Sequence, residues 1–174
     1  MGKRLAGPFQ SKTFKKVVVV VGMLLIVLTF AIYLDPEPFL RFGYLGVFVF
    51  NLFGPGTLLI PVLSRYMNVV ALAFVSASGI VLNDSVGWVV GKSGDAVITR
   101  SKRALMVREI IQKLGFWGLF LWALIPIPHD IVGVVTGYLG FPYKWFVVPT
   151  FLGIFVRFLL LGCVTIAVVG RVPV

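Results

Sequence analysis

The sequence predicts an all-helical integral membrane protein. Of its 174 residues, 59% are hydrophobic and 13% charged, whereas soluble domains average about 45–50% apolar and about 25% charged residues. The apolar residues form runs long enough to cross a bilayer, for which roughly 17–25 residues suffice. The net charge of +10 lies mainly in short segments beside these runs, a pattern that orients membrane proteins. We therefore expect membrane lipids as partners, and no nucleic acid.

The chain begins with a basic arm over residues 1–16, followed by an apolar run over residues 17–34. A signal peptide has the same order, but this run exceeds the roughly 7–15 residues of a signal-peptide core, and no A-x-A cleavage site follows. We therefore predict a retained transmembrane anchor over 17–34, with the arm in the cytoplasm. The turn "DPEPF" (Asp35–Phe39) ends this helix, because a proline disfavours helix in the residue before it.

Two later apolar runs, Tyr44–Ser64 and Leu114–Phe141, are each interrupted near the middle. The interrupting residues are Gly54, Pro55 and Gly56 in the first run, and Pro126 and Pro128 in the second. Non-helical backbone at membrane depth survives only when it is buried in protein or lines a wet cavity. We therefore predict two re-entrant helical hairpins, each followed by a transmembrane helix.

The segment Lys92–Lys113 between these regions is basic, and its apolar residues recur at helical spacing. If every apolar run crossed the membrane, this segment would lie outside, against the positive-inside rule. Re-entry of the first broken run places it in the cytoplasm. We therefore predict a basic amphipathic helix over 92–113 among anionic headgroups, and a multi-pass protein of the cell membrane.

The two broken regions also resemble each other. Phe42–Phe50 matches Leu114–Trp122 at an offset of 72 residues. The paired positions are Gly43 with Gly115, Gly46 with Gly118, Phe48 with Phe120 and, after two added residues, Gly79 with Gly153 and Asn83 with Arg157. Glycine and phenylalanine recur by chance in membrane chains, but here register, breaks and topology agree. We therefore predict an inverted repeat of residues 43–91 and 114–170, a layout that places transporter sites near the bilayer midplane.

Ionisable residues within apolar segments are candidates for function, because charge is costly in lipid. Asp84 and Arg157 fall at nearly equivalent places in the two repeats. They form either a charge pair that changes partner during transport, with Arg157 binding a lipid phosphate, or a static pair that holds the halves together. Both interpretations stay open.

The remaining candidates lie at the breaks. Asp130 either caps a half-helix or belongs to an anion site at its N-terminus. His129 is either a proton-coupling group or an ordinary polar lining residue. Asn51 and Thr57, beside the glycines of the first break, contact substrate or satisfy the backbone.

Motifs of enzymes and metal sites are not found in the sequence. It has no G-x-S-x-G turn with a histidine in reach, no H-E-x-x-H and no multi-carboxylate motif. Cys163 is the one cysteine, so no intrachain disulfide forms. We predict a protein that is not an enzyme and has no cofactor and no metal; whether it forms a homo-oligomer stays open.

Two stretches carry a family resemblance. "GIVLNDSVGWVVGKSGD" (Gly79–Asp95) resembles a glycine-rich segment of the DedA family, also called the SNARE-associated or VTT-domain family. The stretch Lys113–Phe158, with its broken hairpin and glycine-bearing final helix, is similar to the family's second half. This resemblance implies two facing re-entrant hairpins and movement of a lipid between leaflets: phospholipids in eukaryotic members, a polyprenyl phosphate in bacterial ones.

The chain departs from the bacterial pattern in both hairpins. The first has Asn51 and no acidic residue, and the second reads "ALIPIPHD" instead of Arg-Phe-x-Pro-x-x-Arg. Because arginine is the natural bidentate partner of phosphate, this departure weighs against a polyprenyl phosphate but not against a lipid. The function expected is transbilayer lipid movement; the alternatives are a proton- or ion-coupled solute transporter and a non-transporting membrane organiser.

Overall fold

The computed structural model describes residues 12–53, 56–93, 102–125 and 130–172, and these residues are mainly helical with no strand among them. The elements, in order, are α1 (Lys12–Leu34), α2 (Glu37–Leu40), α3 (Gly43–Phe53), the 3₁₀ turn η2 (Gly56–Leu59), α4 (Ile60–Leu63), α5 (Val69–Lys92), α6 (Lys102–Leu124), α7 (Asp130–Tyr138) and α8 (Tyr143–Val169). The predicted all-helical class is confirmed.

Two of these helices, α5 and α8, are long and apolar enough to cross a membrane, with mean hydropathies of 1.8 and 2.5. At about 1.5 Å per residue both exceed the roughly 30 Å hydrocarbon core. The apolar part of α1, Val19–Leu34, is shorter. Side chains along α1 such as Leu24, Ile26 and Phe30 are more than 60% exposed.

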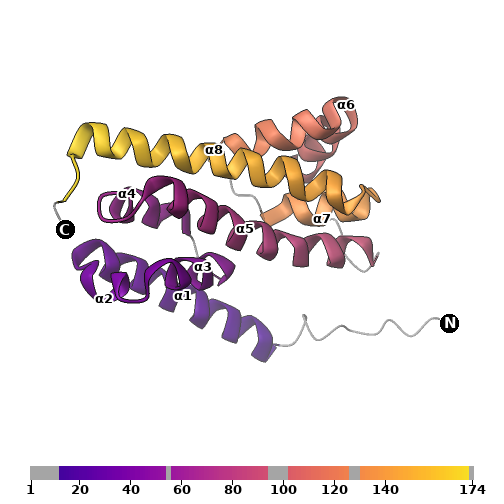
Figure 1. Cartoon of the computed structure of the whole chain (residues 1–174). Helices are drawn as coiled ribbons and strands as arrows, with labels where there is room; N and C mark the ends of the chain where they lie inside the picture. The colour runs from indigo at the N-terminus through magenta and orange to yellow at the C-terminus, as the bar shows by residue number, and fades with distance from the viewer. Residues whose placement is uncertain (1–11, 54–55, 94–101, 126–129, 173–174) are drawn as a thin grey trace.

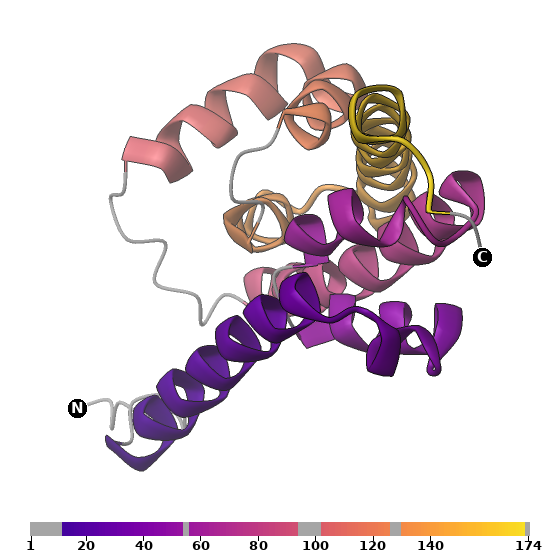
Figure 2. The ribbon, with the colours of Figure 1, turned by 90° about the vertical axis from the view of Figure 1, so that its left-hand side faces the viewer.

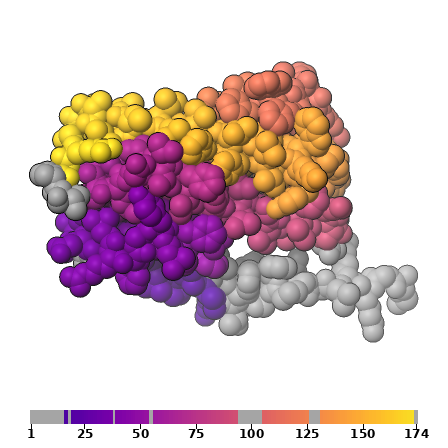
Figure 3. All heavy atoms as spheres, viewed as in Figure 1, coloured from indigo at the N-terminus to yellow at the C-terminus, as the bar shows by residue number. Residues whose placement is uncertain are grey.

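The long helices α5 and α8 lie side by side and the shorter helices pack against them (Figure 1). Helix α5 packs against α3, α7 and α8, and α8 packs against α6, α5 and α4. Each long helix therefore contacts helices from both halves of the chain. Figure 2 shows α1 projecting from this group, and on the face drawn in Figure 3 the helices of both halves form one continuous packed body.

Glycines allow two equivalent close contacts between helices. A Cβ atom at Gly79 of α5 would lie 2.9 Å from the carbonyl oxygen of Phe48 in α3. A Cβ atom at Gly153 of α8 would lie 2.5 Å from the carbonyl oxygen of Phe120 in α6. Small residues let membrane helices approach closely, so Gly79 and Gly153 each allow a close helix contact.

Two glycines with positive φ mark the starts of corresponding segments. Gly43, with φ of 55°, opens α3, and Gly115, with φ of 52°, interrupts α6. A side chain is strained at such φ values, and glycine is not. These are residues that the 72-residue offset pairs, and Gly115 separates the basic part of α6 from its apolar part.

The predicted amphipathic segment 92–113 is divided in the structure. Lys92 is the last residue of α5, α6 begins at Lys102, and residues 94–101 lie outside the described residues. Within α6, Val107 and Ile111 are buried, whereas Arg108 and Lys113 are exposed. Leu105, Met106 and Leu114 are also exposed, so the amphipathic character of this segment stays a prediction.

Candidate functional site

The two charged residues predicted to lie at equivalent places are both buried near the middle of long helices. Asp84 on α5 is 5% exposed and Arg157 on α8 is 6% exposed. Their charges attract each other through the protein interior. Because α5 and α8 lie side by side, the structure brings this predicted pair into one region, where low dielectric strengthens the attraction.

Arg157 connects α8 to the end of α6. Its Nη1 donates a hydrogen bond of 3.2 Å to the carbonyl oxygen of Ile125, and its guanidinium carbon lies 5.0 Å from the ring centre of Phe158. Its buried Nε has no hydrogen-bond partner among the described residues. Ile125 is the last described residue before 126–129, so this arginine lies beside the second break.

Asn51 has the corresponding place beside the first break. Its Nδ2 donates to the carbonyl oxygen of Val47 at 2.7 Å and approaches Oγ of Ser76 on α5 at 3.4 Å. The carboxamide also packs directly on Gly56, leaving no room there for a Cβ atom. Asn51 is 1% exposed, whereas Thr57 is partly exposed. The contacts of Asn51 with Val47 and Gly56 are of the kind that the predicted backbone role requires.

Several predicted site residues lie outside what the structure describes. These are Gly54, Pro55, Pro126, Pro128 and His129. Asp130 is the first residue of α7, but its side chain is not among those described. Its predicted capping role and the predicted roles of His129 stay predictions.

Some buried polar residues were not singled out from the sequence. Ser76 is fully buried and contacts Asn51. Thr150 is fully buried on α8, and its Oγ1 has no hydrogen-bond partner within the described part of the chain. The hydroxyl of Tyr143 donates to Oγ of Ser85, next to Asp84, at 3.0 Å. Thr150 precedes Arg157 by seven residues, which places both on one face of the helix, and this spacing could have revealed it.

The chemistry of this region favours an anion. A buried guanidinium with an N–H group that no described residue uses can donate to a phosphate or carboxylate, and such charge-assisted hydrogen bonds are strong. Charged groups inside a membrane mark substrate pathways by default. The described residues contain no group of three or more His, Cys, Asp or Glu that could hold a metal ion.

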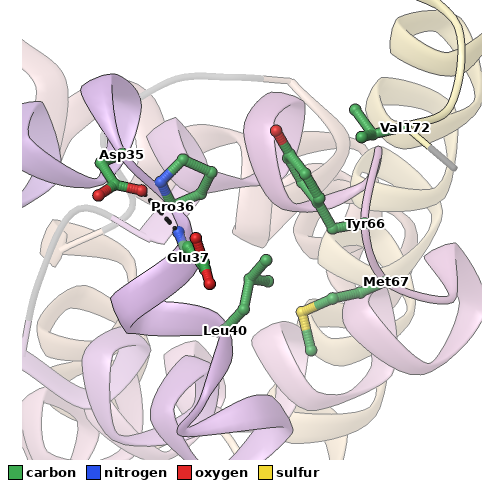
Figure 4. A pocket seen from close by; sticks show the side chains of 7 residues that line it. All are labelled: Asp35, Pro36, Glu37, Leu40, Tyr66, Met67 and Val172. Carbon is green, nitrogen blue, oxygen red and sulfur yellow. Dashed lines mark hydrogen bonds between the residues drawn. The ribbon is translucent and has the colours of Figure 1, made fainter. Parts of the chain in front are cut away.

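Two cavities differ in their relation to these residues. One, of about 240 Å³, is lined by Leu124, Arg157, Leu160, Leu161 and Val164. A larger one, of about 640 Å³, is lined by Asp35, Pro36, Glu37, Leu40, Tyr66, Met67 and Val172 (Figure 4). The larger cavity contains none of the predicted site residues, and Oδ1 of Asp35 accepts a hydrogen bond of 3.1 Å from the backbone N–H of Glu37. The smaller cavity is the one that reaches a buried charge.

Comparison with known proteins agrees with the earlier resemblance. The family model described as VTT domain matches residues 17–166. The match includes α3 to α7 and most of α1 and α8. No curated protein and no solved structure gives a significant match.

Proposed function

The chain belongs to the VTT-domain (DedA) family, and we propose that it moves a lipid between the two leaflets of the membrane through a cavity between its two broken helical segments. The observation that carries this proposal is Arg157, a cation buried at 6% exposure in an apolar helix. Burial of an arginine in an apolar helix is energetically unfavourable, so such an arginine is expected to have a functional role.

The matching layout of the two halves supports an inverted repeat of re-entrant hairpins. Each half has an apolar helical segment (α3, and the part of α6 after Gly115), then shorter helical structure (η2 with α4, and α7) and a long helix (α5, and α8). The halves share a positive-φ glycine at Gly43 and Gly115, and a close helix contact at Gly79 and Gly153. Under this proposal the long helices α5 and α8 cross the membrane, and the two breaks approach its midplane from opposite faces.

The proposed mechanism uses the attraction between Asp84 and Arg157. A lipid phosphate that crosses the apolar midplane loses its hydration, which is unfavourable unless another charge replaces it. Arg157 offers that charge, because its Nε has no partner among the described residues. We propose that the head group takes part of Asp84's place beside Arg157 during passage, and that the pair forms again afterwards.

The proposed orientation follows the basic residues. We place the protein in the cell membrane as a multi-pass protein, with its N-terminus and the basic part of α6 in the cytoplasm. The exposed Arg108 and Lys113 on α6 support contact with anionic headgroups there.

The experiment is a fluorescent-lipid movement assay with purified protein in liposomes, with and without a pH gradient. The test variant is D84N/R157Q, which removes both buried charges together so that neither is left uncompensated. Its control is Arg108→Gln, which neutralises an exposed arginine on α6. We expect lipid movement to fall at least about tenfold in the double variant and to stay unchanged in the control.

Two results would reject the proposal. One is normal lipid movement by the double variant. The other is no movement by folded wild-type protein with phosphatidyl and polyprenyl lipids. Dependence of lipid movement on the pH gradient would show that protons drive it, whereas solute uptake that depends on a proton gradient would favour the proton-coupled solute transporter.

A further inference from the structure

The cavity beside Arg157 combines one charge with an otherwise aliphatic lining. Its other lining residues are Leu124 of α6 and Leu160, Leu161 and Val164 of α8. Arg157 is 6% exposed, and its Nε has no hydrogen-bond partner among the described residues. Arg157 therefore lines an apolar groove, and its solvent-inaccessible Nε has no described acceptor.

The groove runs along α8 and is open at the outer surface of the helix. Leu160, Leu161 and Val164 follow Arg157 by three, four and seven residues, so they share its side of the helix. Seven residues span about 10 Å of helix. Leu160 is 56% exposed and Val164 is 59% exposed, so in a membrane this side of the groove meets lipid.

The size of the cavity restricts what it can hold. About 240 Å³ is below the roughly 300–1,000 Å³ of pockets that enclose a whole drug-sized molecule. A whole lipid does not fit, but part of one hydrocarbon chain lying along α8 does. The complementary ligand has an anionic group at the Arg157 end and an aliphatic chain beyond it.

We propose that the groove formed by Leu124, Leu160, Leu161 and Val164 is a lateral binding site for one hydrocarbon chain of an anionic lipid whose head group binds Arg157. This inference rests on the proposed function only in taking Arg157 as the head-group ligand. In this site the head group contacts Arg157, and the tail lies in the groove at the boundary between protein and lipid.

This arrangement makes the site selective for head-group charge and not for the tail. Surrounding lipid is as apolar as the leucines of the groove, so a tail gains little by moving from one to the other. Binding then depends on the charge-assisted hydrogen bonds to Arg157. Chains of different length are expected to bind about equally well, and removal of the head-group charge is expected to abolish binding.

Photo-crosslinking tests the site without requiring any lipid movement. The full chain in phosphatidylcholine vesicles receives phosphatidic acid with a photoreactive diazirine in its tail, and labelled peptides are mapped by mass spectrometry. The matched probe is diacylglycerol with the same tail and no phosphate. We expect label at Leu124 and within 157–164 from phosphatidic acid, and at least about tenfold less from diacylglycerol.

Two tryptophan variants separate the groove from its surroundings. Val164→Trp fills the groove, whereas Val168→Trp changes a residue that is 78% exposed and does not line it. We expect Val164→Trp to reduce labelling at Leu124 and within 157–164 at least about tenfold, because the indole displaces the tail from the groove. We expect Val168→Trp to leave this labelling unchanged, with equal melting temperatures. Equal labelling by both probes, label mainly elsewhere, or unchanged labelling of Val164→Trp would overturn the inference.

The labelling result and the transport result can fail separately. Charge-selective labelling of the groove in a protein that moves no lipid would support this site and reject the proposed function. Lipid movement that needs Arg157, with labelling that Val164→Trp does not reduce, would overturn the lateral site and keep the proposed function.

Discussion

Helix α3 contacts α5, and α6 contacts α8, at glycines in equivalent positions. The side chains beside these two glycines differ. Gly79 lies against Phe48 and the Cβ atom of Asn51, and Gly153 lies against Phe120 and the Cβ atom of Ala123. The 72-residue offset pairs Asn51 with Ala123. The backbone contact is therefore shared, whereas the polar side chain beside it belongs to the first half alone.

In the first half a side chain of the short helix makes the polar contact, whereas in the second half a side chain of the long helix makes it. Asn51 reaches from the short helix α3 to Ser76 on α5, whereas Arg157 reaches from the long helix α8 to the carbonyl oxygen of Ile125 at the end of α6. The shared glycine contacts meet a packing requirement of the fold. The polar residues are where the two halves differ, so they are the residues to change when function is tested.

The largest effect is expected from separating the two buried charges. Asp84→Asn and Arg157→Gln each leave one charge in an apolar interior, and each should lower the free energy of unfolding by about 3–5 kcal/mol. The double variant should lose less than either single variant. Denaturant titration in mixed micelles measures this coupling, and additive losses would mean that the two charges are energetically independent.

The shared glycine contact is expected to matter in both halves. Gly79→Ala and Gly153→Ala each push a Cβ atom against a backbone carbonyl, and each should lower the free energy of unfolding by about 1–3 kcal/mol. Gly22→Ala is the control, because a Cβ atom there meets nothing within 4 Å. Thermal melting in detergent compares the three variants; a loss at one of the two contact glycines only would break the equivalence of the halves.

Exchange of the residues that differ sharpens the comparison further. Asn51→Ala removes hydrogen bonds to Val47 and Ser76 and should destabilise by about 1–2 kcal/mol. Ala123→Asn introduces an amide where Ala123 is fully buried, and should destabilise by a similar amount because its polar atoms lose water. Thermal melting of both proteins checks this, and a stabilised Ala123→Asn variant would contradict it.

The smallest effect is expected at His129, which the 72-residue offset pairs with Thr57. If the buried charges alone handle the lipid, His129→Gln should leave lipid movement within about twofold and its pH dependence unchanged between pH 5 and 8, where histidine titrates. Liposome assays across that range provide the measurement. A flattened pH profile would contradict this expectation and make His129 a proton-coupling group.

Much of the architecture was predictable because the bilayer constrains it. Helices were expected where apolar runs matched the thickness of the membrane, and α5 and α8 meet that requirement. The pairing of Gly43 with Gly115 was readable as a repeat, and both have positive φ. The resemblance to the VTT-domain family is confirmed by the family model.

The contacts of the candidate site were less predictable. The sequence marked Arg157 as a buried charge, but not that it donates to Ile125, 32 residues away. It marked Asn51 but not its neighbour Ser76, 25 residues away. These contacts depend on how the helices cross and on which turns meet, and neither follows from local spacing.

By itself, therefore, the sequence determined the class of protein, the runs that form helices and the ionisable residues that lie within apolar segments. These follow from local properties: the length of apolar runs, the backbone freedom of glycine and the cost of burying charge. Only the tertiary structure decided which buried groups meet and that Arg157 lines a groove whose Leu160 and Val164 side chains are exposed. The physical reason is that such contacts join residues on different helices, whose relative rotation and register are set by packing over the whole molecule.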